Sequence, residues 1–205
     1  MTRSLSRLFA LAMTFISAPA LAQMTPFPPP PTPPQVGPYI GGGIGLAQAK
    51  KGCLGILSGG GRACDDSDMA FGGYAGYRPL QFVAAELAYH DLGNVTASGT
   101  GFNEHVHAMV MDLTALGILQ ITENLGAFLR LGAYRATLDT SIRGVDDHTN
   151  GNVTYGAGLQ WNLDMVKGLG IRLDWQRYKK VGGDNTPYGT NNYDVLNASL
   201  FWRFR

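Results

Sequence analysis

The chain is 205 residues long, carries a formal net charge of +1 and contains 28 glycines, about twice the usual share of roughly 7 %. The length suffices for one domain with a core. The near-zero charge excludes a field that would attract DNA, RNA or an anionic surface, so no nucleic acid partner is expected. The glycines follow no G-X-Y period, which excludes collagen. They lie inside alternating segments, where glycine indicates tight curvature or closely approaching backbones.

Residues 1–22 have the features of a secretory signal peptide. Arg3 and Arg7 provide a positive start, Leu8 to Ala18 an apolar stretch, and Ala20 to Ala22 a small-x-small cleavage site. A membrane anchor would need about 20 apolar residues instead. The sequence therefore predicts export and a mature chain that starts at Gln23.

A proline-rich segment follows, which the sequence places at residues 23–37, ahead of a domain spanning 38–205. Proline forbids helix and favours an extended polyproline rod. The segment is interpreted as a stiff periplasmic spacer, although docking into a partner groove is an alternative.

Two cysteines, Cys53 and Cys64, occur in the chain. In an exported protein such a closely spaced pair predicts a disulfide. A zinc site is the alternative, but two thiols without a neighbouring histidine fall short of the four ligands that zinc takes.

Segments with a period of two follow one another from Pro38 onward, separated by polar, glycine-rich breaks. Short breaks (78–80, 120–123, 164–167) alternate with long ones (49–68, 93–105, 139–151, 180–192). This arrangement predicts an all-β fold, an eight-stranded antiparallel up-and-down transmembrane β-barrel. A soluble lipocalin-like barrel would not need two sets of connections that differ so systematically. The predicted strands are about 38–48, 69–78, 81–92, 106–119, 124–138, 152–163, 168–179 and 193–204.

Apolar and polar residues alternate one for one along these segments, as in IRLDWQ (171–176). One face is nearly free of charge in every strand, and an Arg or Lys on a lipid-facing surface would cost about 2–4 kcal/mol. The uncharged face is therefore expected to meet lipid. The opposite face would point into a lumen that eight strands leave just wide enough for side chains. Because buried charges persist only when paired, a lumen charge network is predicted. Its members are Glu86, Asp112, Arg130, Arg172, Asp174 and Arg203.

Aromatic residues on the uncharged face fall near both ends of the strands, as expected for side chains at membrane–water interfaces. A general preference of aromatics for strands is the alternative. The predicted interface aromatics are Phe71, Tyr89, Tyr155 and Trp175 at the long-loop ends, and Tyr77, Trp161, Trp202 and Phe204 at the short-turn ends.

Four motifs, in this order, resemble the OmpA-like transmembrane domain, a family that includes the small eight-stranded surface antigens of Gram-negative bacteria. They are FGGYAGYRPLQFVAAELAYHDLG (71–93), LGAFLRLGAY (125–134), TYGAGLQWNLDMVKGLGIRLDWQRY (154–178) and LNASLFWRF (196–204).

The resemblance implies a cell outer-membrane protein whose lumen is plugged by salt-bridged side chains, with Glu86, Arg130, Arg172 and Asp174 at the family's charged positions. It implies contact with outer-membrane lipid and lipopolysaccharide, and with the barrel-assembly machinery through the C-terminal strand. Contact of the four long loops with host surfaces or phage is implied as well. The sequence departs from the family in its fourth strand, where LTALG (113–117) stands in place of a motif that often holds lysine. It also carries Arg205 after the usual final Phe.

The chain contains four histidines that could take part in catalysis or metal binding: His90, His105, His107 and His148. Strand-borne deacylases place a serine two residues after a histidine, and none does so here. A metal site of His105 and His107 with Glu104 or Asp91 is an alternative to simple solvation. We expect no enzyme and no cofactor, and a structural or surface-interaction role. A narrow pore or a lipid A-modifying enzyme is the alternative function.

Overall fold

The computed structural model describes residues 36–50, 63–99, 102–140, 148–182 and 190–204. The predicted signal peptide 1–22, most of the spacer 23–37, and Cys53 lie outside the described residues, as does the side chain of Cys64. The cleavage site, the spacer and the disulfide therefore stay predictions. Across the ranges given above, no helix is long and apolar enough to cross a membrane.

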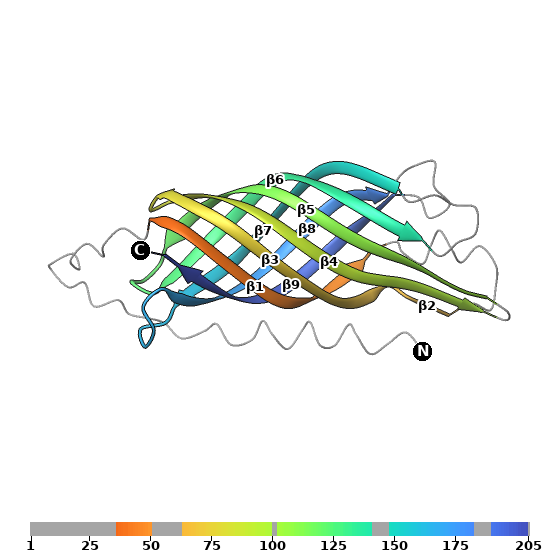
Figure 1. Ribbon diagram of the computed structural model, residues 1–205, viewed down its shortest axis with the longest axis horizontal. Helices are drawn as coiled ribbons and strands as arrows, with labels where there is room; N and C mark the ends of the chain where they lie inside the picture. The colour runs from red at the N-terminus through yellow and green to blue at the C-terminus, as the bar shows by residue number, and fades with distance from the viewer. Residues whose placement is uncertain (1–35, 51–62, 100–101, 141–147, 183–189, 205) are drawn as a thin grey trace, which may run out of the picture. The chain divides into compact units, whose positions relative to one another are not determined.

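Nine strands make up the described fold (Figure 1). They are β1 (Gly37–Ala49), β2 (Ala63–Asp65), β3 (Ser67–Leu80), β4 (Val83–Gly99), β5 (Phe102–Gln120), β6 (Leu125–Thr140), β7 (His148–Asn162), β8 (Leu169–Gly182) and β9 (Thr190–Arg203).

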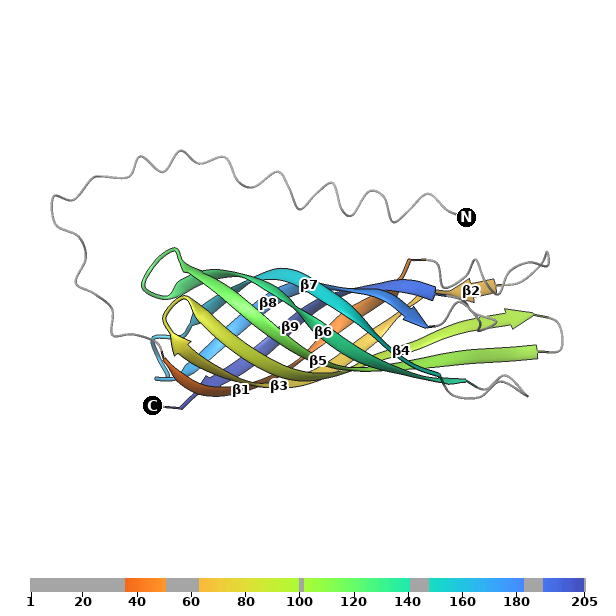
Figure 2. The same cartoon turned by 90° about the horizontal axis from the view of Figure 1, so that it is seen from above.

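Eight of these strands close into a barrel, each antiparallel to its neighbours (Figure 2). β1 pairs with both β3 and β9, with Tyr39 opposite Arg203, and β4 pairs with β5. β2 is a three-residue addition that pairs with β4, Cys64 lying opposite Ala97. The predicted eight-stranded up-and-down barrel is confirmed.

Connections at the two ends of the barrel differ, as predicted, but one predicted loop was wrong. Residues 81–82, 121–124 and 163–168 form the short turns at one end. At the other end, most of the break predicted at 93–105 is strand, because Asn94 to Gly99 pair with His107 to Phe102. The predicted strand ends were placed where the outward apolar residues end, but the strands continue beyond that point.

Two bulges mark the point where β4 and β8 leave the regular part of the barrel. The register shifts between Asp91 and Asn94 on β4, and between Tyr178 and Val181 on β8. Each shift adds one residue and so reverses which alternate side chains point inward. Lys180, in the second bulge, adopts a positive φ of 56°. The reversal keeps the apolar Val95 and Val181 inside, at 6 % and 1 % exposure.

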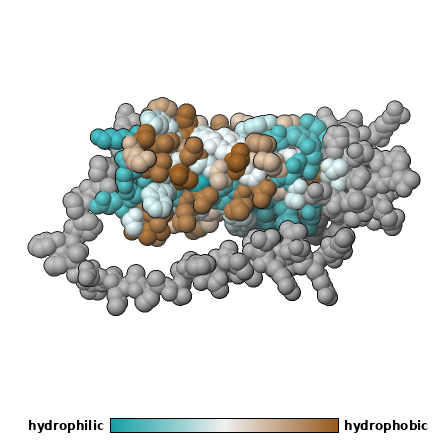
Figure 3. Space-filling view, turned by 90° about the horizontal axis from the view of Figure 1, so that it is seen from below, coloured by the Kyte–Doolittle hydropathy of each residue, from teal (hydrophilic) through white to brown (hydrophobic). Residues whose placement is uncertain are grey.

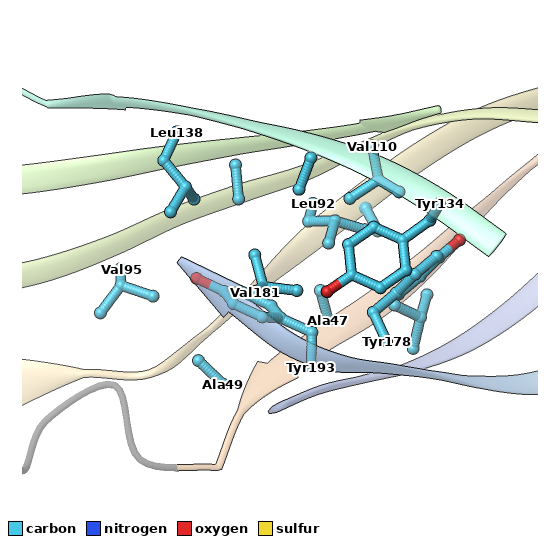
Figure 4. Close-up of a cluster of buried hydrophobic side chains, with 14 residues drawn as sticks. Ala47, Ala49, Leu92, Val95, Val110, Tyr134, Leu138, Tyr178, Val181 and Tyr193 are labelled. Carbon is cyan, nitrogen blue, oxygen red and sulfur yellow. The ribbon is translucent and has the colours of Figure 1, made fainter. Parts of the chain in front are cut away.

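The interior holds two apolar clusters. The first lies toward the short turns and includes Tyr39, Tyr74, Phe128 and Phe201. The second lies toward the long-loop end (Figure 4), where its labelled side chains come from strands on different sides of the barrel. Its members are Ala47, Ala49, Ala70, Leu92, Val95, Ala108, Val110, Tyr134, Ala136, Leu138, Tyr178, Val181, Tyr193 and Val195.

Large rings fit into so narrow an interior because glycine lies beneath them. A Cβ on Gly41 would come within 2.3 Å of the Tyr74 ring, and one on Gly76 within 2.4 Å of the Tyr39 ring. Both tyrosines therefore need glycine as their cross-strand neighbour, which accounts for part of the unusual glycine content.

Candidate functional site: the outer belt and the lumen

The outer wall of the barrel carries a broad belt of exposed apolar side chains. Ile44, Leu113, Leu129 and Leu131 point outward with 55–69 % exposure. Figure 3 shows hydrophobic residues gathered over the short-turn half of the barrel, while hydrophilic residues cover the wall nearer the long-loop end. A contiguous apolar surface of this extent marks a region that contacts something other than water.

The belt has a sharp upper limit. On four strands, the last apolar outward residue is followed two positions further toward the long loops by a polar one. These pairs are Leu46 and Gln48 on β1, Tyr89 and Asp91 on β4, Trp175 and Arg177 on β8, and Leu196 and Asp194 on β9. Beyond this line the wall is polar outside and apolar inside, the reverse of the belt.

Just above the line, charged side chains pair with one another. Arg177 donates two hydrogen bonds to Asp194, from Nε to Oδ1 (2.5 Å) and from Nη2 to Oδ2 (2.7 Å), and Lys50 Nζ lies 3.0 Å from Asp194 Oδ2. Burial alone raises the pKa of Asp194. The hydrogen bonds from Arg177 and Lys50 outweigh it and hold that pKa below its ordinary value.

The eight aromatic residues predicted for the interfaces all lie on the outer face, either exposed or half-buried. At the long-loop end, Tyr155 and Trp175 meet edge to face with ring centroids 5.9 Å apart. Their position on the outer face agrees with the sequence pattern; their role at the membrane interfaces stays a prediction.

Glu86 lies at the centre of a buried polar cluster in the lumen. Its carboxylate accepts hydrogen bonds from Arg172 Nη1 (2.6 Å), Arg130 Nη2 (3.2 Å) and the Tyr39 hydroxyl (2.7 Å). Glu86, Arg130 and Arg172 are 1–4 % exposed. An isolated charge at this depth would be strongly unfavourable, and three charge-assisted hydrogen bonds offset its desolvation.

The cluster continues from Arg130 toward the long-loop end. Arg130 Nη1 donates to Gln176 Oε1 (2.6 Å), and its Nη2 lies 3.7 Å from Asp174 Oδ2. Gln176 in turn donates to Thr154 Oγ1 (2.9 Å) and Asp112 Oδ2 (3.2 Å). The structure thus brings four predicted members, Glu86, Arg130, Arg172 and Asp174, into direct proximity, and links Asp112 to them through a neutral amide.

Asp112 and Arg203 have different surroundings from those four. Asp112 accepts a hydrogen bond from the Tyr178 hydroxyl (2.7 Å), and His90 Nε2 lies 3.8 Å from its Oδ2. Arg203 lies at the short-turn end, where its Nη1 donates to Asn162 Oδ1 (3.2 Å).

Sequence reasoning missed several interior residues, among them Tyr39, Tyr74, Gln176 and Arg78. The Arg172 guanidinium lies 4.5 Å from the Tyr74 ring centroid, within cation–π distance. Arg78 was assigned to a turn, but it is 2 % exposed and donates to the Gln81 carbonyl. Alternation counted onward from Tyr74 through Gly76 would have placed it inward.

The described structure covers only some of the histidines on which the catalytic and metal alternatives depend. His90 is buried in the lumen, and His107 Nε2 lies 3.3 Å from Asp91 Oδ1 on the outer side. The side chains of Glu104 and His105 lie outside the described residues. Among the side chains that are described, no group of three or more His, Cys, Asp or Glu could hold a metal ion.

Residues 35–205 match the family described as the OmpA-like transmembrane domain. The chain belongs to this family. OmpA-like transmembrane barrels are Gram-negative outer-membrane proteins, so the belt is the surface that meets the hydrocarbon of the outer membrane, and the short turns face the periplasm.

Curated relatives in this family carry the name outer membrane protein A. The protein of Klebsiella aerogenes is 26 % identical over 141 residues, which cover 68 % of this chain and 40 % of the relative. That of Yersinia pseudotuberculosis serotype I is 25 % identical over 175 residues, covering 81 % and 48 %. The chain therefore spans less than half the length of these OmpA relatives.

Solved OmpA-like and other small outer-membrane barrels share the fold. The outer membrane protein OprG of Pseudomonas aeruginosa superimposes with a TM-score of 0.55 at 13 % identity, covering 83 % of this chain and 97 % of OprG. Ail, the attachment invasion locus protein of Yersinia pestis, gives 0.50 at 16 % identity, covering 82 % and 99 %. At such identities these likenesses show the fold alone.

Proposed function

We propose that the protein is a structural outer-membrane barrel whose lumen is closed by its own side chains and whose long-loop end makes contacts at the cell surface. The observation that carries the first part is the cluster around Glu86, where side chains from β1, β4, β6 and β8 meet across the interior. An eight-stranded barrel leaves room for little more than these side chains.

A surface-interaction role is supported by the long-loop end. There β4 and β5 continue past the apolar belt with Asn94, Thr96 and His107 on the outer face, so these strands extend beyond the hydrocarbon into water. A barrel of the same fold, Ail, is named for attachment and invasion. The partner proposed for this end is a host surface or a phage.

Lipid and assembly contacts complete the proposal. The belt and its aromatic residues would contact outer-membrane lipid and lipopolysaccharide. β9, which closes the barrel against β1, would be the strand read by the barrel-assembly machinery.

Planar-bilayer recording of the purified full chain tests the closed lumen. A closed lumen passes no steady ionic current, whereas a narrow pore gives discrete current steps. Such steps, abolished by a blocking substitution in the lumen, would contradict the proposal. Mass analysis of lipid A from cells with and without the protein addresses the enzymatic alternative, and an altered lipid A would replace the structural role with a catalytic one.

A further inference from the structure

The outer wall over β5, β6 and β7 contains a hollow of about 710 Å³. This volume is within the range of small-molecule sites. The hollow, called the wall groove below, is lined by Phe82, Gly117, Ile118, Leu119, Ala127, Phe128, Leu129, Ala157, Gly158 and Leu159.

Alternating small and large outward residues create the wall groove. Gly117 lies opposite Leu129, which lies opposite Ala157; one row nearer the short turns, Leu119, Ala127 and Leu159 face one another. The leucines stand out from the wall, at 69 %, 69 % and 48 % exposure. A Cβ on Gly117 would meet nothing within 4 Å, so the wall is open at this point.

The wall groove lies within the apolar belt and close to the periplasmic end of the barrel. Leu119 lies two residues before the 121–124 turn, and Ala127 lies three residues after it. All ten lining residues are apolar. A polar ligand would find no hydrogen-bonding side chain there, whereas hydrocarbon chains surround this face of an outer-membrane barrel.

Charged residues of both signs lie at the end of the same strands. Lys167 and Asp164 are exposed in the turn that joins β7 to β8, and Glu123 is exposed in the turn that joins β5 to β6. A phospholipid whose chain lies along β5 to β7 would have its headgroup at the level of these turns. A zwitterionic phosphatidylethanolamine headgroup, with a phosphate and an ammonium, complements charges of both signs.

We propose that the wall groove binds one acyl chain of a phospholipid from the periplasmic leaflet. A thin, flexible acyl chain fits a groove bounded by leucines on both sides. At the floor, the small side chains leave space that the acyl chain fills, and it gains van der Waals contacts there. The site lies on the opposite side of the wall from the lumen, so it does not depend on whether the lumen conducts.

Filling the groove tests the proposal. The full chain, folded in vesicles of phosphatidylethanolamine and phosphatidylglycerol, would be transferred to a mild detergent and the lipid retained per barrel counted by native mass spectrometry. We expect one retained phospholipid. We expect Gly117→Leu and Ala157→Leu each to reduce retention about tenfold, as losing contact with roughly two methylene groups would do.

Ala198→Leu is the matched control, because Ala198 is an exposed outward residue of β9, outside the groove. It should leave retention unchanged, and heat-modifiable migration on a gel would verify that each variant is folded. Equal retention in all three variants, or none in the unmodified chain, would overturn the proposal. A dimer of the unmodified chain that Gly117→Leu separates would assign the groove to a second copy instead.

A second measurement needs no variant. Phosphatidylethanolamine with a diazirine on its acyl chain, photolysed in the same vesicles, should label the segments 117–119, 127–129 and 157–159 several-fold more than the outer faces of β1 and β9. Uniform labelling around the barrel would show that the wall groove holds no preferred chain.

Discussion

The belt and the long-loop end of the barrel are built from the same strands but with opposite polarity. In the belt, leucines face outward and Glu86 and Arg172 are buried inside. Above the line at Arg177 and Asp194, charged residues face outward while Leu138, Val181 and their neighbours are buried inside. The strand pairing is the same in both regions, so the surrounding solvent decides which face is apolar.

The largest effect is expected from the lumen of the belt. Arg172→Glu would remove the guanidinium whose Nη1 donates to Glu86 Oε1 at 2.6 Å, and would add a second buried carboxylate to the same cluster. Breaking a buried pair costs about 3–5 kcal/mol, and reversal should exceed this. Urea unfolding in micelles would measure the change. Arg135→Glu, at an exposed site on the outer wall of β6, is the control and should shift stability by about 0.5 kcal/mol or less. Equal midpoints for the two variants would contradict the pairing.

The interior above the belt should respond as an ordinary hydrophobic core. Leu138 is 2 % exposed within the cluster of Figure 4. Leu138→Ala should cost about 2–5 kcal/mol in the same unfolding assay. Leu131→Ala, at an outward site in the belt with 65 % exposure, should cost much less, because detergent chains of the micelle fill the vacated space. A larger loss of stability for Leu131→Ala than for Leu138→Ala would contradict the assignment of Leu131 to the lipid-facing surface and Leu138 to a buried core.

A charge introduced on the outer wall distinguishes the part of the wall that faces lipid from the part that faces water. Leu113→Arg, at 62 % exposure in the belt, should cost about 2–4 kcal/mol when unfolding is measured in lipid vesicles. Thr149→Arg, at an exposed site near the long-loop end of β7, should be close to neutral. Similar losses of unfolding free energy in the two variants would contradict a boundary between lipid and water at this level of the barrel.

The smallest effect should come from the charged residues just above the boundary, and it should depend on pH. Because the pKa of Asp194 is lower in the folded than in the unfolded chain, its pair with Arg177 contributes stability above the unfolded value of about 3.9. That contribution is lost as the pH falls through the folded value. Asp194→Asn should therefore cost about 1 kcal/mol or less at pH 7 and nothing in strong acid. A cost that persists below pH 3 would attribute the effect to packing.

The sequence was sufficient to predict the strand order and the facing of the strands. A period of two fixes which residues share a face, and the lack of charge identifies the face toward lipid, so Leu129 and Arg130 were correctly separated. Partners across the lumen could not be predicted in this way. Arg172 and Glu86 lie 86 residues apart, on β8 and β4, and meet across the lumen because the sheet closes into a ring, which alternation does not encode.

The extent of the strands beyond the belt was also missed, for a related reason. The stretch from Asn94 to Gly99 is mostly polar or small and resembles a loop, because outside hydrocarbon a strand needs only its inward residues, such as Val95, to be apolar. The bulge at Asp91 further hid the pattern by reversing the alternation.

The seam between β1 and β9 has a consequence for biogenesis. Tyr39 and Arg203 are nearly the whole domain apart in sequence, so every other strand must be delivered before these two can hydrogen-bond. Until then the sheet has two open edges, each able to template aggregation with another polypeptide. Folding of this domain is thus completed by its last strand. A nascent chain interrupted before residue 190 would need a chaperone to keep it from aggregating.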